Sequence, residues 1–135
     1  MNTLKIAIQK SGRLHDESIQ ILKDCGISVY NGNDQLKVTA SNFPLEVYYL
    51  RNSDIPQYLI DGVVDIAIVG DNLLVEKGQN IQIAEKLGFS KCKVSVAVPK
   101  NFNYNSIQDL NGLRVATSYP KTVVDYFSSK GISVD

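Results

Sequence analysis

The chain has 135 residues, of which 44% are apolar, and its 14 basic side chains balance its 14 acidic ones. This length allows one domain with a real hydrophobic core. The balanced charge gives no reason to expect a nucleic acid or an anionic membrane as a partner. No apolar run approaches the roughly 20 residues of a membrane span, and the first residues, MNTLKIAIQ, lack the pattern of a secretory signal. We therefore expect a cytoplasmic protein.

The cysteine and histidine content indicates no metal site. Cys25 and Cys92 lie far apart and have no second Cys and no His at ligand spacing. This is typical of free cytosolic thiols rather than of a zinc site. The lone histidine, His15, is expected to be an ordinary exposed residue near the start of a helix, without a role as a general base.

A strand and a helix joined by a polar turn are expected first in the chain. The strand covers residues 4–9, the helical pattern runs from Leu14 to Cys25, and Gly26 ends it. The turn between them, residues 10–13, has the sequence KSGR. Its backbone amides, the helix N-terminus and two cations predict an anion site. An ordinary solvated loop with two surface cations explains the same residues about equally well.

Residues 27–50 are expected to form β structure around turn chemistry at Gly32-Asn33-Asp34. The alternation of Leu36, Val38 and Ala40 with polar residues predicts a half-exposed strand, and residues 45–50 predict another. Arg51 follows that second strand directly and precedes a helix start. A second cationic turn on the same edge of the sheet would strengthen the predicted anion site. A surface salt bridge explains Arg51 about equally well.

The helix expected next begins with Asp54 as its N-cap, has Pro56 in its first turn and ends at Gly62. Its spacing predicts that one face packs on the sheet. The residues on that face are Ile55, Tyr58, Leu59 and Val63. Asp65 is interpreted as a junction between this helix and the next strand, in preference to a catalytic role.

The stretch from residue 66 to residue 76 combines a buried strand with a turn. Ile66–Val69 is a continuous apolar run, which is typical of a parallel strand buried on both faces. Gly70-Asp71-Asn72 follows and leads into a helical pattern from Leu73. Ligands of open α/β sheets bind at such carboxyl ends of strands.

The remainder of the chain suggests a boundary and a second unit. Alternation over residues 92–98 predicts a strand with one covered face, which Pro99 ends. The Asn-rich stretch 99–106 then favours a first α/β lobe over residues 1–100 and the start of a second over residues 101–135. The second lobe is expected to hold a short helix 107–110 capped by Ser106, a strand 113–116, a helix after Tyr119-Pro120 with Val123, Tyr126 and Phe127 inward, and the first residues of a strand at 132–134.

Three blocks of the sequence together resemble ATP phosphoribosyltransferase, the first enzyme of histidine biosynthesis. They are IAIQKSGRL at 6–14, DIPQYLIDGVVDIAIVGDNLL at 54–74 and GLRVATSYPKTVVDYFSSKGI at 112–132. The blocks occur in order over nearly the whole chain. The resemblance implies a two-lobed α/β fold like that of a type II periplasmic binding protein, here truncated, with the active site in the cleft between the lobes.

The resemblance also implies a reaction. N1 of the adenine of ATP attacks the anomeric carbon of phosphoribosyl pyrophosphate and displaces pyrophosphate with inversion. Mg2+ is required and is bound mainly by the substrates' phosphates. Cations and amide-lined turns would stabilise the departing pyrophosphate, and the protein's main tasks would be positioning and electrostatics.

The same resemblance assigns roles to individual residues. The catalytic cations are Arg13, Lys10 and Arg51, and the substrate-binding residues are Ser11, Gly12, Asp71, Thr117, Ser118 and Tyr119. Three structural alternatives stay open: Asp71 as a helix cap, Ser118 as an N-cap, and Tyr119 as a core residue. No metal ligand is assigned to the protein itself, and the catalytic forms of the family are expected to be homo-oligomers.

In the family, the loop that binds phosphoribosyl pyrophosphate and the histidine-binding regulatory domain lie beyond the position of residue 135. We therefore expect this stretch alone not to hold phosphoribosyl pyrophosphate and not to turn over. Two other hypotheses compete with the transferase. One is a non-catalytic small-molecule-binding module of the same lobed fold, and the other is a structural subunit that completes itself by pairing with another chain.

Overall fold

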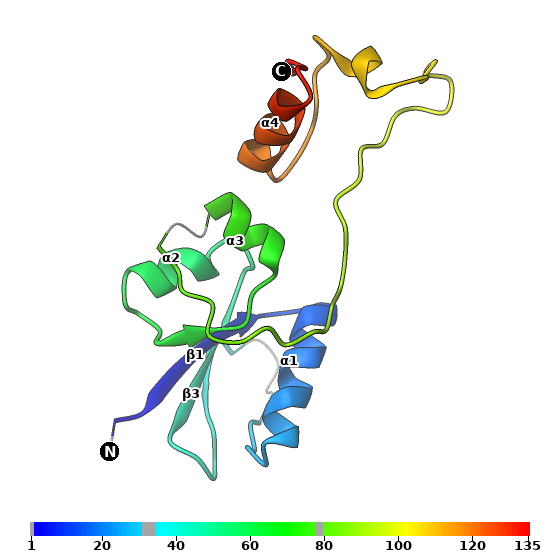
Figure 1. Cartoon of the computed structure of the whole chain (residues 1–135). Helices are drawn as coiled ribbons and strands as arrows, with labels where there is room; N and C mark the ends of the chain where they lie inside the picture. Colours follow the sequence, from blue (N-terminus) through cyan, green and yellow to red (C-terminus); the bar gives the residue numbers. More distant parts are fainter. Residues whose placement is uncertain (1, 31–34, 78–79) are drawn as a thin grey trace. The chain divides into compact units, whose positions relative to one another are not determined.

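The computed structural model describes residues 2–30, 35–77 and 80–135 (Figure 1). It divides into two units, Met1–Lys91 and Cys92–Asp135. The sequence analysis placed the boundary later, between residues 100 and 101. The turn expected at Gly32-Asn33-Asp34 lies outside the described residues.

The first unit is built on a four-stranded sheet with the order β2-β3-β1-β4. Its strands are β1 (Leu4–Gln9), β2 (Lys37–Thr39), β3 (Leu45–Leu50) and β4 (Ile66–Ala67). β1 pairs in parallel with β3 on one side and with β4 on the other, whereas β2 is antiparallel to β3. β1 is therefore a central strand of a mixed sheet, and the predicted α/β class is confirmed.

Helix α1 (Arg13–Asp24) covers one face of this sheet (Figure 1). Because side chains alternate along a strand, Ile6 and Ile8 of β1 point to the same face as Val47 of β3. They form one core cluster with Leu22 of α1. The predicted helix thus exists, and Leu14 and Leu22 of its predicted apolar positions pack here, whereas Cys25 is exposed.

Helices α2 (Ile55–Ile60) and α3 (Asp71–Lys77) lie on the other side of the sheet. Ile55 and Val64 pack there against Ala7 of β1. The sequence analysis chose Val63 for this face, and that prediction was wrong: Val63 is 41% exposed, whereas Val64 is 3% exposed. Gly62 ends the helix with a φ of 69°, so the helical spacing stops before residue 63.

Two strand predictions also need correction. Ile66 was expected to be buried on both faces, but its side chain is exposed because β4 is a two-residue strand that pairs only with β1 among the described strands. Leu36 was expected to share the buried face of Val38, but it is also exposed and lies just outside β2. Val38 and Ala40 are buried as predicted.

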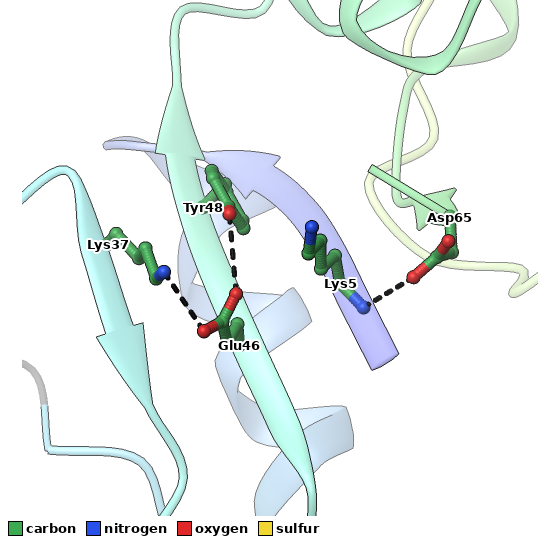
Figure 2. Close-up of polar contacts among 5 residues, drawn as sticks. All are labelled: Lys5, Lys37, Glu46, Tyr48 and Asp65. Atoms are coloured by element: carbon green, nitrogen blue, oxygen red, sulfur yellow. Dashed lines mark hydrogen bonds and ion pairs between the residues drawn. The ribbon is translucent and has the colours of Figure 1, made fainter. Parts of the chain in front are cut away.

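The outer part of the sheet carries polar side chains (Figure 2). Lys37 of β2 forms an ion pair of 2.9 Å with Glu46 of β3. The Tyr48 hydroxyl donates to the same carboxylate at 3.3 Å. The Lys37 ammonium lowers the pKa of the Glu46 carboxyl, and its own pKa is raised in return.

The second unit holds a 3-10 helix, η1 (Ile107–Leu110), and helix α4 (Pro120–Ser129). Its core joins Leu110, Phe127 and Ile132. Tyr126 was expected to point inward with Phe127, but it is exposed, whereas Phe127 is 1% exposed. Adjacent residues of a helix point about 100° apart, so only one of them can face so small a core.

Two extended segments of the second unit run side by side. Gly112 and Val115 N–H groups donate to Ser133 and Asp135 at 2.7 Å each, and Asp135 N–H donates to Leu113 at 3.0 Å. The sequence predicted strands near residues 113–116 and 132–134; the two segments pair through these hydrogen bonds, but neither forms a regular strand.

The strand predicted over residues 92–98 is absent from the described structure. The side chains of Val94, Val96 and Val98 are exposed. A strand needs a neighbour for its N–H and C=O groups, and this segment pairs with no other described segment. Alternation of apolar and polar residues shows that a segment could lie in a sheet, but it does not show whether a partner strand is present.

Candidate functional site at the carboxyl edge of the sheet

Three turns leave the sheet at the same edge, because β3, β1 and β4 are parallel. They begin after Leu50, after Gln9 and after Ala67. The Lys10 N–H group donates to the Leu50 carbonyl at 2.9 Å. This hydrogen bond fixes the first residue of the KSGR turn against the residue that precedes Arg51. Two predicted cationic turns are therefore neighbours.

The β1–α1 turn is shaped by Gly12, which has a φ of 89° and occupies the N-cap of α1. A Cβ at this position would meet only the Gln9 amide, at 3.7 Å. The backbone conformation, rather than crowding, therefore favours glycine. No side chain of the described residues caps the helix. Lys10, Ser11 and Arg13 are exposed, so the turn presents its cations and hydroxyl to solvent.

Arg13 contacts the end of the first unit. Its Nη2 donates to the Lys91 carbonyl at 3.3 Å. One turn further along α1, Glu17 accepts a hydrogen bond from the Ser90 hydroxyl, and Phe89 packs against the core cluster under α1. The guanidinium is thus held beside the N-terminus of α1.

Arg51 lies in a short turn between β3 and α2. Its carbonyl accepts from the Asp54 N–H group at 2.9 Å, and its side chain is exposed. Asp54 occupies the predicted N-cap, but its carboxylate makes no capping hydrogen bond to the helix. It accepts instead from the Ser53 hydroxyl at 3.3 Å.

Sequence reasoning missed Asn52 in this turn. Its Oδ1 atom is buried and has no hydrogen-bond partner among the described residues. A buried acceptor without a partner is costly in a folded protein. The sequence did hold one indication of its place at this edge, because Asn52 follows Arg51, which comes directly after the end of β3.

The third turn leads from β4 into α3. Asp71 was expected either to line the nucleotide site or to cap a helix beginning at Asn72. The helix begins at Asp71 itself, so this residue lies in the first turn and is not the cap. Its exposed carboxylate suits the positive end of the helix. Lys86 approaches it at 4.0 Å, with both side chains largely in solvent, so the pair adds little.

The prediction that His15 is exposed was wrong. The side chain is 8% exposed, and its Nδ1 atom lies 2.8 Å from the Gln9 carbonyl oxygen. Its ring packs on Tyr49 of β3 with centroids 5.6 Å apart. The Tyr49 hydroxyl is buried without a hydrogen-bond partner among the described residues, and burial raises its pKa.

The remaining predicted site residues belong to the second unit. Thr117 Oγ1 accepts from the Tyr119 N–H group at 2.9 Å, and Tyr119 occupies the N-cap of α4. The alternative that Ser118 is this N-cap is therefore wrong. Ser118 is exposed and Tyr119 is half-buried. The structure brings the turns with Lys10, Arg51 and Asp71 to one edge of the first unit, and a joint site with residues 117–119 stays a prediction.

Within the described parts of the chain, no cluster of three or more His, Cys, Asp and Glu residues is arranged to hold a metal ion. None of the helices described is both long and apolar enough to cross a membrane. Cys25 and Cys92 are free and exposed.

Comparison with known proteins identifies a family that this chain matches. A model of the ATP phosphoribosyltransferase family matches residues 51–135. An ATP phosphoribosyltransferase from Cytophaga hutchinsonii is 50% identical over 129 residues, which cover 96% of this chain and 45% of that protein. One from Parabacteroides distasonis is 43% identical over 132 residues, which cover 98% and 47%. The chain thus spans less than half the length of these curated relatives.

A solved structure is similar in fold. The ATP phosphoribosyl transferase (HisG:HisZ) complex from Thermotoga maritima contains a chain that superposes with a TM-score of 0.65 at 26% identity. The match covers 98% of the present chain and 62% of the solved one. The similarity therefore includes both units of the present chain.

Proposed function

The chain belongs to the ATP phosphoribosyltransferase family, and on that premise we propose that it forms part of a histidine-biosynthetic transferase. The reaction joins the 5-phosphoribosyl group of phosphoribosyl pyrophosphate to N1 of the adenine of ATP and releases pyrophosphate. The whole reaction belongs to the longer protein that the relatives represent, since the chain spans less than half of their length.

The observation that carries this proposal within the chain is the hydrogen bond from Lys10 N–H to the Leu50 carbonyl. It places the turn containing Arg13 next to the turn containing Arg51. Two cationic turns at the carboxyl edge of a parallel sheet suit a polyphosphate, because guanidinium groups and helix N-termini both bind phosphate oxygens.

In the proposed reaction, the adenine ring is the nucleophile, and the protein needs no nucleophilic side chain. Positive charge develops on the ribosyl ring while negative charge develops on the departing pyrophosphate. Lys10, Arg13 and Arg51 would stabilise that negative charge. The backbone amides of Ser11 and Gly12 would orient the phosphates, so that catalysis rests on positioning and electrostatics.

The donor chemistry of this edge bears on magnesium. Mg2+ prefers oxygen ligands in octahedral geometry, whereas these turns offer mainly cations and N–H donors. We propose that the ion is held mainly by the substrates' phosphates, and that Asp71 is a carboxylate at this edge that could add an oxygen ligand. Bound magnesium would neutralise part of the phosphate charge, and the arginines would neutralise the rest.

Further parts of the proposal rest on the family. They include a two-lobed fold of the type II periplasmic-binding-protein kind, with Thr117, Ser118 and Tyr119 facing the nucleotide from the second lobe. They also include an oligomeric assembly, which is supported by the Thermotoga maritima relative having been solved as a HisG:HisZ complex. A cytoplasmic location fits such a biosynthetic enzyme.

Calorimetric titration of the purified chain with ATP, with and without Mg2+, tests the proposed site. We expect binding at roughly millimolar affinity or better, weakened by about 1–3 kcal/mol in Arg13→Ala, as for a charge-assisted contact. Lys23→Ala is the matched control, because this substitution removes a cation from the opposite end of α1. Equal weakening by both variants would reduce the effect to net charge and contradict a site at the KSGR turn.

Turnover is the second measurement. Pyrophosphate release from ATP and phosphoribosyl pyrophosphate is expected from the longer protein and is expected to be absent with this stretch alone. Binding of ATP by the stretch without competition from pyrophosphate would favour a simple binding module over the transferase.

A further inference from the structure

We propose that His15 is a positioning residue that holds the KSGR turn in its anion-binding conformation by bridging the ends of β1 and β3. This inference rests on the proposed function for the role of the turn. It assigns to His15 no contact with substrate and no proton transfer. The case depends on where the imidazole lies and on what it touches.

The first contact of His15 is with β1. Its Nδ1 atom lies 2.8 Å from the carbonyl oxygen of Gln9, the last residue of β1. A carbonyl oxygen can only accept a hydrogen bond, so Nδ1 carries the proton and donates it. Lys10 follows Gln9 directly. The imidazole thus reaches back from the first turn of α1 to the residue at which the anion-binding turn begins.

The second contact is with β3. The ring of His15 packs against Tyr49 with centroids 5.6 Å apart and planes tilted by 47°. Tyr49 is 4% exposed and precedes Leu50, whose carbonyl accepts from Lys10 N–H. One side chain therefore touches both strands that lead into the cationic turns.

The burial of His15 makes this contact specific. A polar ring inside a protein is costly unless its polar atoms are hydrogen-bonded, and an apolar side chain would fill the space under α1 without that cost. The imidazole instead closes a loop of contacts from α1 to Gln9 and, through Tyr49 and Leu50, back to Lys10. Gly12, with its φ of 89°, lies within this loop, so the turn is held at both of its ends.

The test uses the whole chain and three substitutions. His15→Asn places an amide donor near the position of Nδ1, His15→Gln places it one bond further out, and His15→Leu has a similar volume without a donor. Two quantities are measured: the amide hydrogen exchange of Lys10, whose N–H donates to the Leu50 carbonyl, by NMR, and the Kd for inorganic pyrophosphate by calorimetry. The amide of Val47 in β3 reports on folding.

We expect His15→Leu to speed exchange at Lys10 and to raise the Kd for pyrophosphate, each by about tenfold, while Val47 keeps its protection. His15→Asn should stay within about threefold of the parent chain in both measurements. A purely structural role for the ring would not be rescued by the small Asn side chain.

The proposal is overturned if His15→Leu matches the parent chain in both measurements, or if His15→Asn loses as much as His15→Leu. If His15→Leu also loses the protection of Val47, this variant is unfolded, and His15→Asn is compared with His15→Gln instead. Equal behaviour of these two variants would contradict a hydrogen bond from residue 15 to Gln9. If the parent chain binds no pyrophosphate, the proposed function fails, and the exchange of the Lys10 amide still decides whether His15 positions the turn.

Discussion

Lys5 and Asp65 exchange two hydrogen bonds across the start of the sheet, one of which is marked in Figure 2. The Lys5 N–H group donates to Asp65 Oδ2 at 2.8 Å, and the Asp65 N–H group donates to the Lys5 carbonyl at 2.9 Å. Together they align the beginning of β1 with the chain just before β4, where Ile6 pairs with Ile66. Asp65 is thus the junction residue that the sequence predicted.

Replacement of Asp65 by Ala should destabilise the first unit. The Lys5 N–H group would lose its acceptor, and a hydrogen bond to a charged group contributes about 1.5–3 kcal/mol; because Asp65 is exposed, we expect the lower end. Asp65→Asn keeps an acceptor oxygen and should cost less than half as much. Urea unfolding monitored on residues of β1 measures both. Equal losses in the two variants would show that charge, rather than the acceptor, matters.

Tyr49→Phe should leave the first unit at least as stable at neutral pH. It removes a buried hydroxyl without a partner among the described residues, and the desolvation cost of such a group is about 1–3 kcal/mol. The ring and its contact with His15 are retained. Thermal melting at pH 7 measures the change. A marked loss of stability would reveal a partner for the hydroxyl.

The same variant should change the alkaline limb of stability. Burial raises the pKa of Tyr49 in the folded chain, so the unfolded chain releases this proton first. The contribution of Tyr49 is fully present below about pH 10, its ordinary pKa, and is lost as the pH rises through the folded value. Melting temperatures of the parent chain should therefore fall faster than those of Tyr49→Phe above about pH 10.

Glu46→Gln should flatten the acid limb of the first unit. The Lys37 ammonium lowers the pKa of Glu46 in the folded state. The stabilisation is present above the unfolded pKa, about 4.5, and is lost as the pH falls through the lower folded one. Glu85→Gln, at an exposed site outside the sheet, is the control. An identical acid limb in parent and Glu46→Gln chains would contradict the pairing.

Phe127→Ala should unfold the second unit selectively. Phe127 is 1% exposed and joins Leu110 and Ile132 in a small core, and such a truncation costs about 3–5 kcal/mol. Resonances of residues 106–135 should lose dispersion in an NMR spectrum while those of β1 and β3 persist. Tyr126→Ala, at an exposed neighbour, should leave both units folded. Simultaneous collapse of both units in Phe127→Ala would contradict separate cores.

Features set by local periodicity were predictable from the sequence. β1 follows from its apolar centre and α1 from its helical spacing. The glycines at 12 and 62 begin or end elements because their backbone angles suit few other residues. The turns at the carboxyl edge followed from the same reasoning, since parallel strands place their ends together.

Features set by distant partners were not predictable. The burial of His15 depends on Tyr49, which belongs to another strand, and the exposure of Ile66 depends on β4 having one neighbour among the described strands. The segment 92–98 has the alternation of a strand but no described partner. Asn52 was missed because a buried oxygen leaves no mark on sequence periodicity.

The central place of β1 has a consequence for how the chain is made. The strand emerges from the ribosome before both of its neighbours, β3 and β4, which come later in the sequence. At about 5–20 residues per second, synthesis from Gln9 to Ala67 takes roughly 3 to 12 s. During that time an apolar strand with two unpaired edges is exposed to other nascent chains. We therefore expect chaperones to bind residues 4–9 during translation, before β3 and β4 are available to pair with them.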